Sequence, residues 1–375
     1  MEDIQYYKEI EFNRREKNLK NAKKQKLKFM EKNKEKLNIT YVMTWTGVCG
    51  GSKIILEHAN RLTERGHKIT LLSHDVKPTW FKLNKKVEFI RVPWVEILCK
   101  KIPKETDIIV ATYWREIYEC VEQKIAPVVY FEQGDFHLFD LQKLDKRTFE
   151  YISNGLKTVN YIYTVSNFAK QKLEDVYNVD SIVIPNAVDN NVFYYKEHEK
   201  NEIPNITIIG SEDAEFKRIQ NIIEAIKIIR EKGYKVKLNW ITPSEPIKNK
   251  ELNPIVNPPQ IVIGNVLRNT DIYVCASMYE SFCLPVLEAM TCGAAIITTN
   301  NGGNMDFVKD NVNALIIEKD NINDIVNKIE KLINSRELID SLVKNGVEES
   351  AQYSWNTTIG KIEKYYQEIA NYEIE

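Results

Sequence analysis

Short apolar runs typical of strands alternate with longer segments typical of amphipathic helices from residue 38 onward. The first run, residues 39–45, is followed by the glycine-rich segment 47–51 and then by a helical stretch that ends at Gly66. Parallel strands need a crossover between them, usually a helix, so this alternation predicts an α/β fold with a doubly wound parallel sheet. Further strands of this first half are expected at residues 68–73, 107–111, 127–131 and 161–165.

The same alternation resumes after a polar stretch, which predicts two α/β domains. A helix is expected at 217–232, because Ile219, Ile222, Ile226 and Ile229 fall on one face and Gly233 can end it. Strands of this second half are expected at residues 206–210, 236–241, 271–275, 295–298 and 314–317. The predicted organisation is a basic helical leader at 1–36, an N-terminal domain at 37–190, a linker at 191–204, a C-terminal domain at 205–354 and a terminal helix at 355–375.

Composition excludes several classes of protein. The chain has 375 residues and a formal charge of −1, so its overall charge gives no indication of a nucleic-acid partner. Its six cysteines form no Cys-x-x-Cys pair and most lie in apolar runs, which favours buried, reduced thiols in a cytoplasmic protein. No apolar stretch approaches the roughly 18 residues that span a bilayer, and the N-terminus does not resemble a secretory signal.

The leader carries a strong local charge. Residues 14–36 contain eleven basic and three acidic residues, without proline or glycine. We expect a solvated helix or a flexible arm here. The alternatives are contact with an anionic membrane surface, at the inner face of the membrane, or with a partner protein.

The segment 280–288 places two carboxylates, Glu280 and Glu288, eight positions apart, one in a loop and one in the first turn of a helix. Pro285 suits the start of that helix and Gly293 its end. The backbone N–H groups of Phe282, Cys283 and Leu284 would then lie at its positive end, where phosphate oxygens bind well. Carboxylates beside a phosphate site can accept hydrogen bonds from sugar hydroxyls, which predicts a nucleotide-sugar site.

This segment resembles the Glu-x7-Glu motif of retaining GT-B glycosyltransferases of family 4, glycosyltransferases group 1, with Cys283 where the family usually has glycine. The resemblance implies two facing Rossmann-like domains, an N-terminal helical extension outside the resemblance, and a terminal helix that returns to the first domain. It also implies that Glu280 contacts the transferred sugar and Glu288 the ribose of the donor. Gly50 and Gly51, in the first glycine-rich loop, would then lie near the donor phosphates.

Cations that stabilise the departing diphosphate are expected in the first loop of the second domain. Lys217 stands at the family's lysine position, but Ser211 stands where the family has arginine, so either Arg218 supplies the second cation or this stabilisation is weaker. The resemblance further implies sugar or acceptor contacts from Gln133, Asp135, Gly302 and Gly303. The chain contains no Asp-x-Asp pair, and we expect neither a metal ion nor another cofactor.

These observations predict a hexosyltransferase-type retaining glycosyltransferase that moves a sugar from a nucleotide-diphosphate donor to a glycan, lipid-linked or protein acceptor. Two alternatives remain open. A non-catalytic GT-B binding subunit of a glycosylation complex would account for Ser211, and a nucleotide-sugar epimerase would use the same donor without an acceptor.

Overall fold

The computed structural model describes residues 4–20, 22–197 and 201–375. Contacts divide the chain into two compact units, the first made of Met1–Pro185 with Asn356–Glu375 and the second of Asn186–Trp355. The chain passes from the first unit to the second after Pro185, which lies before the predicted linker. Residues 186–190 therefore belong to the second unit and not to the predicted N-terminal domain. There the Val188 N–H donates to the Tyr353 carbonyl (3.0 Å), and the predicted linker itself packs on this unit through Phe193, which is fully buried.

The first unit contains a seven-stranded sheet in the order β4-β3-β2-β5-β6-β7-β8, in which every pair of neighbours is parallel. Its central strands are buried on both faces, which explains why they appear in the sequence as continuous apolar runs. The strands are β2 (Asn38–Val42), β3 (Lys68–Ser73), β4 (Glu88–Arg91), β5 (Ile108–Ala111), β6 (Val128–Glu132), β7 (Tyr161–Thr164) and β8 (Ile182–Val183). The edge strands β4 and β8 were not predicted, because they are short and partly exposed.

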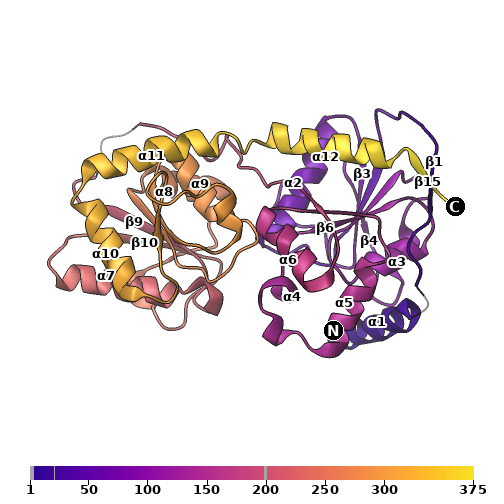
Figure 1. The fold of residues 1–375 in the computed structure, drawn as a ribbon, viewed down its shortest axis with the longest axis horizontal. Coiled ribbons are helices and arrows are strands. Elements are labelled where there is room, and N and C mark those ends of the chain that lie inside the picture. The colour runs from indigo at the N-terminus through magenta and orange to yellow at the C-terminus, as the bar shows by residue number, and fades with distance from the viewer. Residues whose placement is uncertain (1–3, 21, 198–200) are drawn as a thin grey trace. The chain divides into compact units, whose positions relative to one another are not determined.

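Helices cover this sheet, and the last of them joins the two units in sequence (Figure 1). Helix α12 (Trp355–Ile369) is held in the first unit by its Tyr366, whose hydroxyl lies 3.2 Å from that of Tyr41 and 2.9 Å from that of Tyr163. The other helices are α2 (Gly50–Glu64), α3 (Ile117–Glu122), α4 (Phe136–Phe139), α5 (Lys146–Leu156) and α6 (Asn167–Tyr177), with 3-10 turns η1 (Leu98–Lys101) and η2 (Leu141–Lys143).

The leader is neither one helix nor a solvated arm, and that expectation was wrong. Helix α1 (Ile4–Leu19) lies against α5 and α3, and Figure 1 shows it at the edge of the first unit. Its Arg15 is buried because it forms an ion pair with the buried Glu119 (2.8 Å). Strand β1 (Leu27–Phe29) then pairs antiparallel with β15 (Tyr372–Ile374), so the two terminal segments lie side by side.

The second unit contains a six-stranded parallel sheet in the order β11-β10-β9-β12-β13-β14. Its strands are β9 (Asn205–Ile209), β10 (Lys237–Thr242), β11 (Ile255–Val256), β12 (Ile272–Cys275), β13 (Ala295–Thr299) and β14 (Leu315–Ile317). Its helices are α7 (Ile219–Glu231), α8 (Gln260–Arg268), α9 (Leu284–Cys292), α10 (Ile322–Ile333) and α11 (Arg336–Ser350), with 3-10 turns η3 (Glu215–Lys217), η4 (Lys250–Leu252) and η5 (Gly303–Asp306). The fold is therefore α/β with two Rossmann-like units, as predicted.

Helix α7 begins two residues later than predicted. Arg218 adopts a left-handed conformation (φ 51°) that separates the η3 turn, which carries Lys217, from the helix. The four isoleucines of the predicted apolar face are all buried in the core of the second unit. No helix within the described ranges is both long and apolar enough to cross a bilayer.

Candidate functional site

The segment 280–288 leads into helix α9 much as its sequence indicates. The helix begins at Leu284, has Pro285 as its second residue, and ends at Gly293, whose φ of 88° suits glycine. Cys283 precedes the helix in a left-handed conformation (φ 69°), the backbone region in which the family's usual glycine carries no penalty. Glu288 is the fifth helical residue and so lies in the second turn rather than the first, which corrects that prediction.

The start of α9 presents unused backbone donors. In the described part of the chain, no hydrogen bond is found for the N–H groups of Phe282, Cys283 and Leu284. The side chains of Phe282 and Cys283 are buried, so these residues can offer a ligand only their backbone. Unpaired N–H groups at a helix N-terminus form a binding site for phosphate oxygens.

Lys217 and Glu280 form an ion pair in front of this helix. Lys217 Nζ lies 2.5 Å from Glu280 Oε1, and the Ser277 hydroxyl donates to the same oxygen (2.9 Å). Burial favours the neutral amine of Lys217, but the Glu280 carboxylate outweighs burial and raises the lysine's pKa. The ion pair therefore keeps a positive charge at Lys217, which also interacts electrostatically with Cys283 at the start of α9.

The Gly302-Gly303 turn packs directly against the backbone of this segment. Glu280 N–H donates to the Asn301 carbonyl (2.9 Å), and Gly303 N–H donates to the Glu280 carbonyl (3.0 Å). A Cβ on Gly303 would lie 2.3 Å from the backbone carbonyl of Ser281, and Gly302 has a φ of 90°. Both positions therefore require glycine, and the turn fixes the position of Glu280.

Two further residues predicted at the diphosphate site, Arg218 and Ser211, do not join this cluster. The Arg218 guanidinium pairs with Asp320 (Nε to Oδ1, 2.5 Å), a contact made on the exposed side of the η3 turn. Ser211 accepts a hydrogen bond from the Asp213 N–H (3.2 Å) and carries no charge. Lys217 is therefore the predicted cation that lies with Glu280.

Two cysteines lie beside the ion pair. Cys275 Sγ and Cys283 Sγ are 3.8 Å apart and both are buried. The hydrogen bond from Cys283 and the nearby Lys217 charge lower the pKa of Cys275 to about 6, although burial opposes this. Five of the six cysteines are buried, as expected, but Cys49 is exposed because it caps the start of α2. Sequence reasoning missed Ser277 and this sulfur pair, although both precede Glu280 closely.

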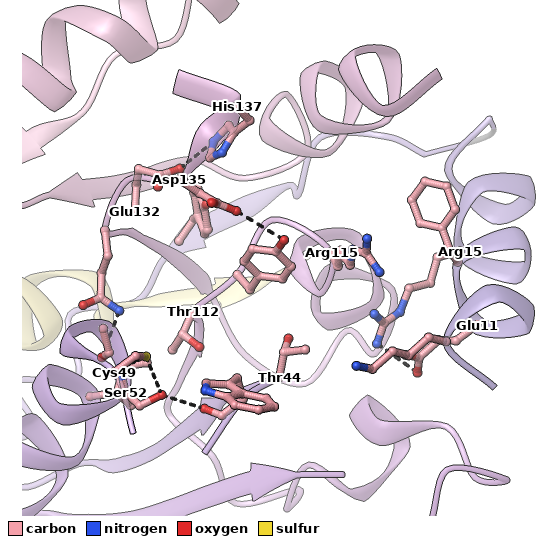
Figure 2. Close-up of a pocket in the computed structure, with 18 of the residues that line it drawn as sticks. Glu11, Arg15, Thr44, Cys49, Ser52, Thr112, Arg115, Glu132, Asp135 and His137 are labelled. Carbon is pink, nitrogen blue, oxygen red and sulfur yellow. Dashed lines mark hydrogen bonds and ion pairs between the residues drawn. The ribbon is translucent and has the colours of Figure 1, made fainter. Parts of the chain in front are cut away.

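The remaining predicted residues lie in the first unit, around a pocket (Figure 2). Gln133 Nε2 donates to the Gly51 carbonyl (3.3 Å), so the glycine-rich loop meets the end of β6. Asp135 caps the short helix α4 and accepts from the Tyr113 hydroxyl (3.4 Å). Gly51, Gln133 and Asp135 line the pocket. Gly50 is the first residue of α2, and a Cβ there would meet nothing within 4 Å.

His137, in the short helix α4, is fully buried. Its Nε2 lies 3.0 Å from Glu132 Oε2, and the Tyr130 hydroxyl donates to the same carboxylate oxygen (2.6 Å). Burial raises the pKa of Glu132, but the charge and hydrogen bond of His137, with those of Tyr130 and the Gly134 N–H, outweigh it, and the net pKa is lowered. The pair places a fixed carboxylate at the pocket.

Among the residues the structure describes, no three His, Cys, Asp or Glu side chains are arranged to hold a metal ion.

Comparisons with known proteins agree with this architecture. An uncharacterized glycosyltransferase of Methanocaldococcus jannaschii is 28% identical over 220 residues, which cover 56% of this chain and 60% of that protein. The chain thus spans less than two thirds of the length of the curated relatives it matches first. Sucrose-phosphate synthase of Thermosynechococcus elongatus has a similar fold (TM-score 0.74, 16% identity, 89% of this chain and 99% of that chain). So does Anabaena HepE, solved in complex with UDP-glucose (TM-score 0.71, 14% identity, 88% and 100%).

Two family models match adjacent parts of the chain. Glycosyltransferase Family 4 matches residues 48–192, and Glycosyl transferases group 1 matches residues 193–349. The first match ends where the second begins, and together they take in most of the first unit's sheet and the Glu280–Glu288 segment. The chain therefore belongs to the group 1, family 4 glycosyltransferases.

Proposed function

We propose that this protein is a retaining glycosyltransferase that transfers a sugar from a nucleotide-diphosphate sugar to a glycan, lipid-linked or protein acceptor, without a metal ion. One observation carries the proposal: the Lys217–Glu280 ion pair lies beside the unpaired N–H groups at the start of α9. The cation and the N–H groups suit a diphosphate, and the carboxylate suits sugar hydroxyls.

In the proposed reaction, the bond between the sugar C1 and the diphosphate oxygen breaks, and a bond from C1 to the acceptor oxygen forms on the same face. The acceptor's proton passes to the leaving phosphate oxygen. Negative charge develops on that diphosphate, where Lys217 and the α9 N–H groups stabilise it, as preoriented donors do in other enzymes. Glu280 orients the transferred sugar, and Glu288 binds the ribose of the donor.

The first experiment is a thermal-shift and calorimetric screen of nucleoside diphosphates and their sugar conjugates. A ligand that binds only the folded protein raises its melting temperature, so the responding base names the donor class. HepE, which shares the fold, was solved with UDP-glucose, so uridine compounds are tested first.

Two variants then separate the roles of the carboxylates. Glu280→Ala should retain donor affinity within a few-fold but lose sugar transfer and slow donor hydrolysis, whereas Glu288→Ala should weaken donor binding. Glu337→Ala, an exposed carboxylate of α11, serves as the matched control. Wild-type transfer by both site variants would overturn the assignment.

Retention and metal independence are tested on the same reaction. The product should keep the anomeric configuration of the donor sugar in its proton NMR spectrum. Transfer should continue at an unchanged rate in excess EDTA. An inverted product, or a rate that EDTA abolishes and Mg²⁺ or Mn²⁺ restores, would contradict this part of the proposal.

A second candidate is a non-catalytic binding subunit on the same scaffold. Two contacts favour this candidate: the Arg218 guanidinium is bound to Asp320, and Ser211 carries no charge. Lys217 is therefore left without a second cation beside it. This candidate predicts nucleotide-sugar binding with neither hydrolysis nor transfer. Measurable hydrolysis that Glu280→Ala abolishes would exclude it.

A further inference from the structure

A pocket of about 610 Å³ lies within the first unit, and helix α1 forms one of its walls. The opposite wall follows the carboxyl ends of β2, β5 and β6, the edge at which parallel α/β sheets bind ligands. Figure 2 shows Glu11 and Arg15 extending from α1 toward these loops. The family models begin at residue 48, so α1 is a feature of this chain outside the matched region.

Helix α1 is held in place by buried ion pairs. Arg15 lies 2.8 Å from Glu119 Oε2 and 3.1 Å from Glu11 Oε1, and Arg14 also contacts Glu119. Glu11 in turn lies 3.2 Å from His74 Nε2. These contacts join α1 to α3 and to the end of β3, so its pocket-facing side chains are positioned in advance of any ligand.

The carboxylates that line the pocket are already engaged, except for one that faces solvent. Glu11 pairs with Arg15 and Glu132 with His137, and Asp135 accepts hydrogen bonds from the Phe136 N–H and Tyr113. Glu9 is exposed. Of these, Glu11 and Glu132 face a cation and a histidine, whereas Asp135 is held by neutral donors.

Two cations that line the pocket have no carboxylate partner among residues 4–20, 22–197 and 201–375. The Arg115 guanidinium lies over the rings of Trp114 (4.9 Å) and Phe12 (5.3 Å), and its buried Nε has no hydrogen-bond partner in this part of the chain. Lys8 of α1 lies over the ring of Trp94 (5.7 Å). A guanidinium that lines a pocket and has no carboxylate partner there is suited to bind the carboxylate or phosphate group of a ligand.

Aromatic side chains surround these cations. Phe12, Trp45, Trp94 and Tyr113 all line the pocket, and Trp45 is 56% exposed. Flat apolar surfaces beside a few oriented polar groups suit a ring-shaped polar ligand such as a sugar.

We propose that this pocket binds an acceptor sugar that carries a negatively charged carboxylate or phosphate group. The inference rests on the proposed transferase function and names its acceptor class. Arg115 binds the anionic group, Lys8 strengthens the attraction, and α1 forms the wall that selects such acceptors over neutral ones.

The test is isothermal titration of the full chain with four probes: methyl glucuronide, glucose 6-phosphate, neutral methyl glucoside and inorganic phosphate. One or both charged sugars should bind about 10- to 100-fold more tightly than methyl glucoside, as a charge-assisted hydrogen bond predicts. The stronger of the two identifies carboxylate or phosphate as the recognised group. Equal affinity for charged and neutral sugars, or phosphate binding as tight as that of glucose 6-phosphate, would overturn the proposal.

Matched variants assign the binding to the pocket. Arg115→Gln should remove the preference for charged sugars, and Arg115→Lys should keep part of it. Arg147→Gln should leave it unchanged, because Arg147 also lies over Phe12 (4.9 Å) but does not line the pocket and pairs with Glu16. Undiminished binding of the charged sugars by Arg115→Gln would overturn the assignment.

Two lysines of α1 test the role of the helix itself. Lys8→Gln should weaken charged-sugar binding about 2- to 5-fold, as expected for a half-exposed charge. Lys17→Gln removes the same charge from an exposed position of α1 that does not line the pocket, and it should have no effect. Equal effects of the two variants would contradict a role for the α1 wall.

Donor binding and donor hydrolysis are measured on the same samples. If wild-type protein and Arg115→Gln both bind and hydrolyse a donor but neither prefers charged sugars, the acceptor inference fails and the transferase proposal stands. If no donor binds, the transferase proposal fails by itself.

Discussion

At the scale of single residues, the candidate donor site depends on two glycines and one ion pair. Gly303 allows the 302–303 turn to touch the backbone of Ser281, and that contact fixes Glu280 opposite Lys217. The identity of these residues is visible in the sequence. The contact between Lys217 and Glu280 is not visible in the sequence, because the two residues are 63 positions apart. The folded sheet brings their loops together.

Gly303→Ala should lower the free energy of unfolding by about 1–3 kcal/mol, because its Cβ would collide with backbone rather than with a movable side chain. It should also weaken donor binding, since Glu280 must shift with the turn. Gly50→Ala, whose Cβ would meet nothing within 4 Å, is the matched control and should change stability little. Urea unfolding measures the stability of both variants. Equal losses of stability in Gly303→Ala and Gly50→Ala would contradict the close packing of the turn.

Glu116 should make the stability of the protein depend on pH. Burial raises its pKa from 4.5 to about 7, although Arg15 and the Thr44 hydroxyl oppose this. Between these values the native state holds more protons than the unfolded state, so this residue's contribution to stability falls as pH rises. Relative to Glu116→Gln, the wild type should lose roughly 3 kcal/mol of unfolding free energy between pH 4.5 and 8. A difference that stays constant over this range would contradict the assignment.

At the scale of elements, α1 is the feature least evident from the sequence. Its charged residues predict a solvated segment, yet Arg15 is 3% exposed because Glu119 and Glu11 lie against it. Charge alone does not distinguish a solvated cation from one matched by carboxylates elsewhere in the chain. That distinction depends on α3, about a hundred residues later.

Arg15→Met should destabilise the protein by about 3 kcal/mol, because it leaves Glu119 buried with only part of its cationic environment. The matched control is Arg147→Met, which breaks the exposed pair with Glu16 and should cost far less stability. Chemical unfolding followed by tryptophan fluorescence measures both. Similar costs would show that α1 is held by its apolar contacts instead.

At the scale of the whole molecule, the two terminal segments lie together on the first unit, and a cationic surface lies beside them. Strand β1 pairs with β15; the exposed lysines Lys23, Lys24 and Lys26 precede β1 in the chain, and the exposed Lys28 lies within it, opposite Glu373. Phe29 and Met30, 57% and 43% exposed, add apolar side chains. We propose that this surface attaches the protein to anionic membranes, where a lipid-linked acceptor would be found.

Replacing these four lysines with glutamine should reduce binding to phosphatidylserine vesicles at least about 10-fold, since each surface lysine contributes about 1 kcal/mol. A control removes the same charge from the second unit, at the exposed lysines Lys227, Lys235, Lys237 and Lys250. Vesicle sedimentation at low and physiological salt measures both. Equal loss in the two variants would indicate net charge rather than this surface, and no vesicle binding by the wild type would exclude membrane attachment.

The sequence by itself determined the α/β class, most strands, the helices α2, α7, α9 and α12, and the residues proposed for the donor site. It could do so because buried parallel strands are continuous apolar runs, and because glycine, proline and paired carboxylates are required locally by backbone geometry and charge. Only the tertiary structure decided that Arg218 turns to Asp320, that His137 is buried against Glu132, and that α1 closes a pocket. Each of these three features depends on a partner that is distant in sequence or on the backbone conformation of a single residue. Such contacts and conformations leave no periodic pattern in the sequence.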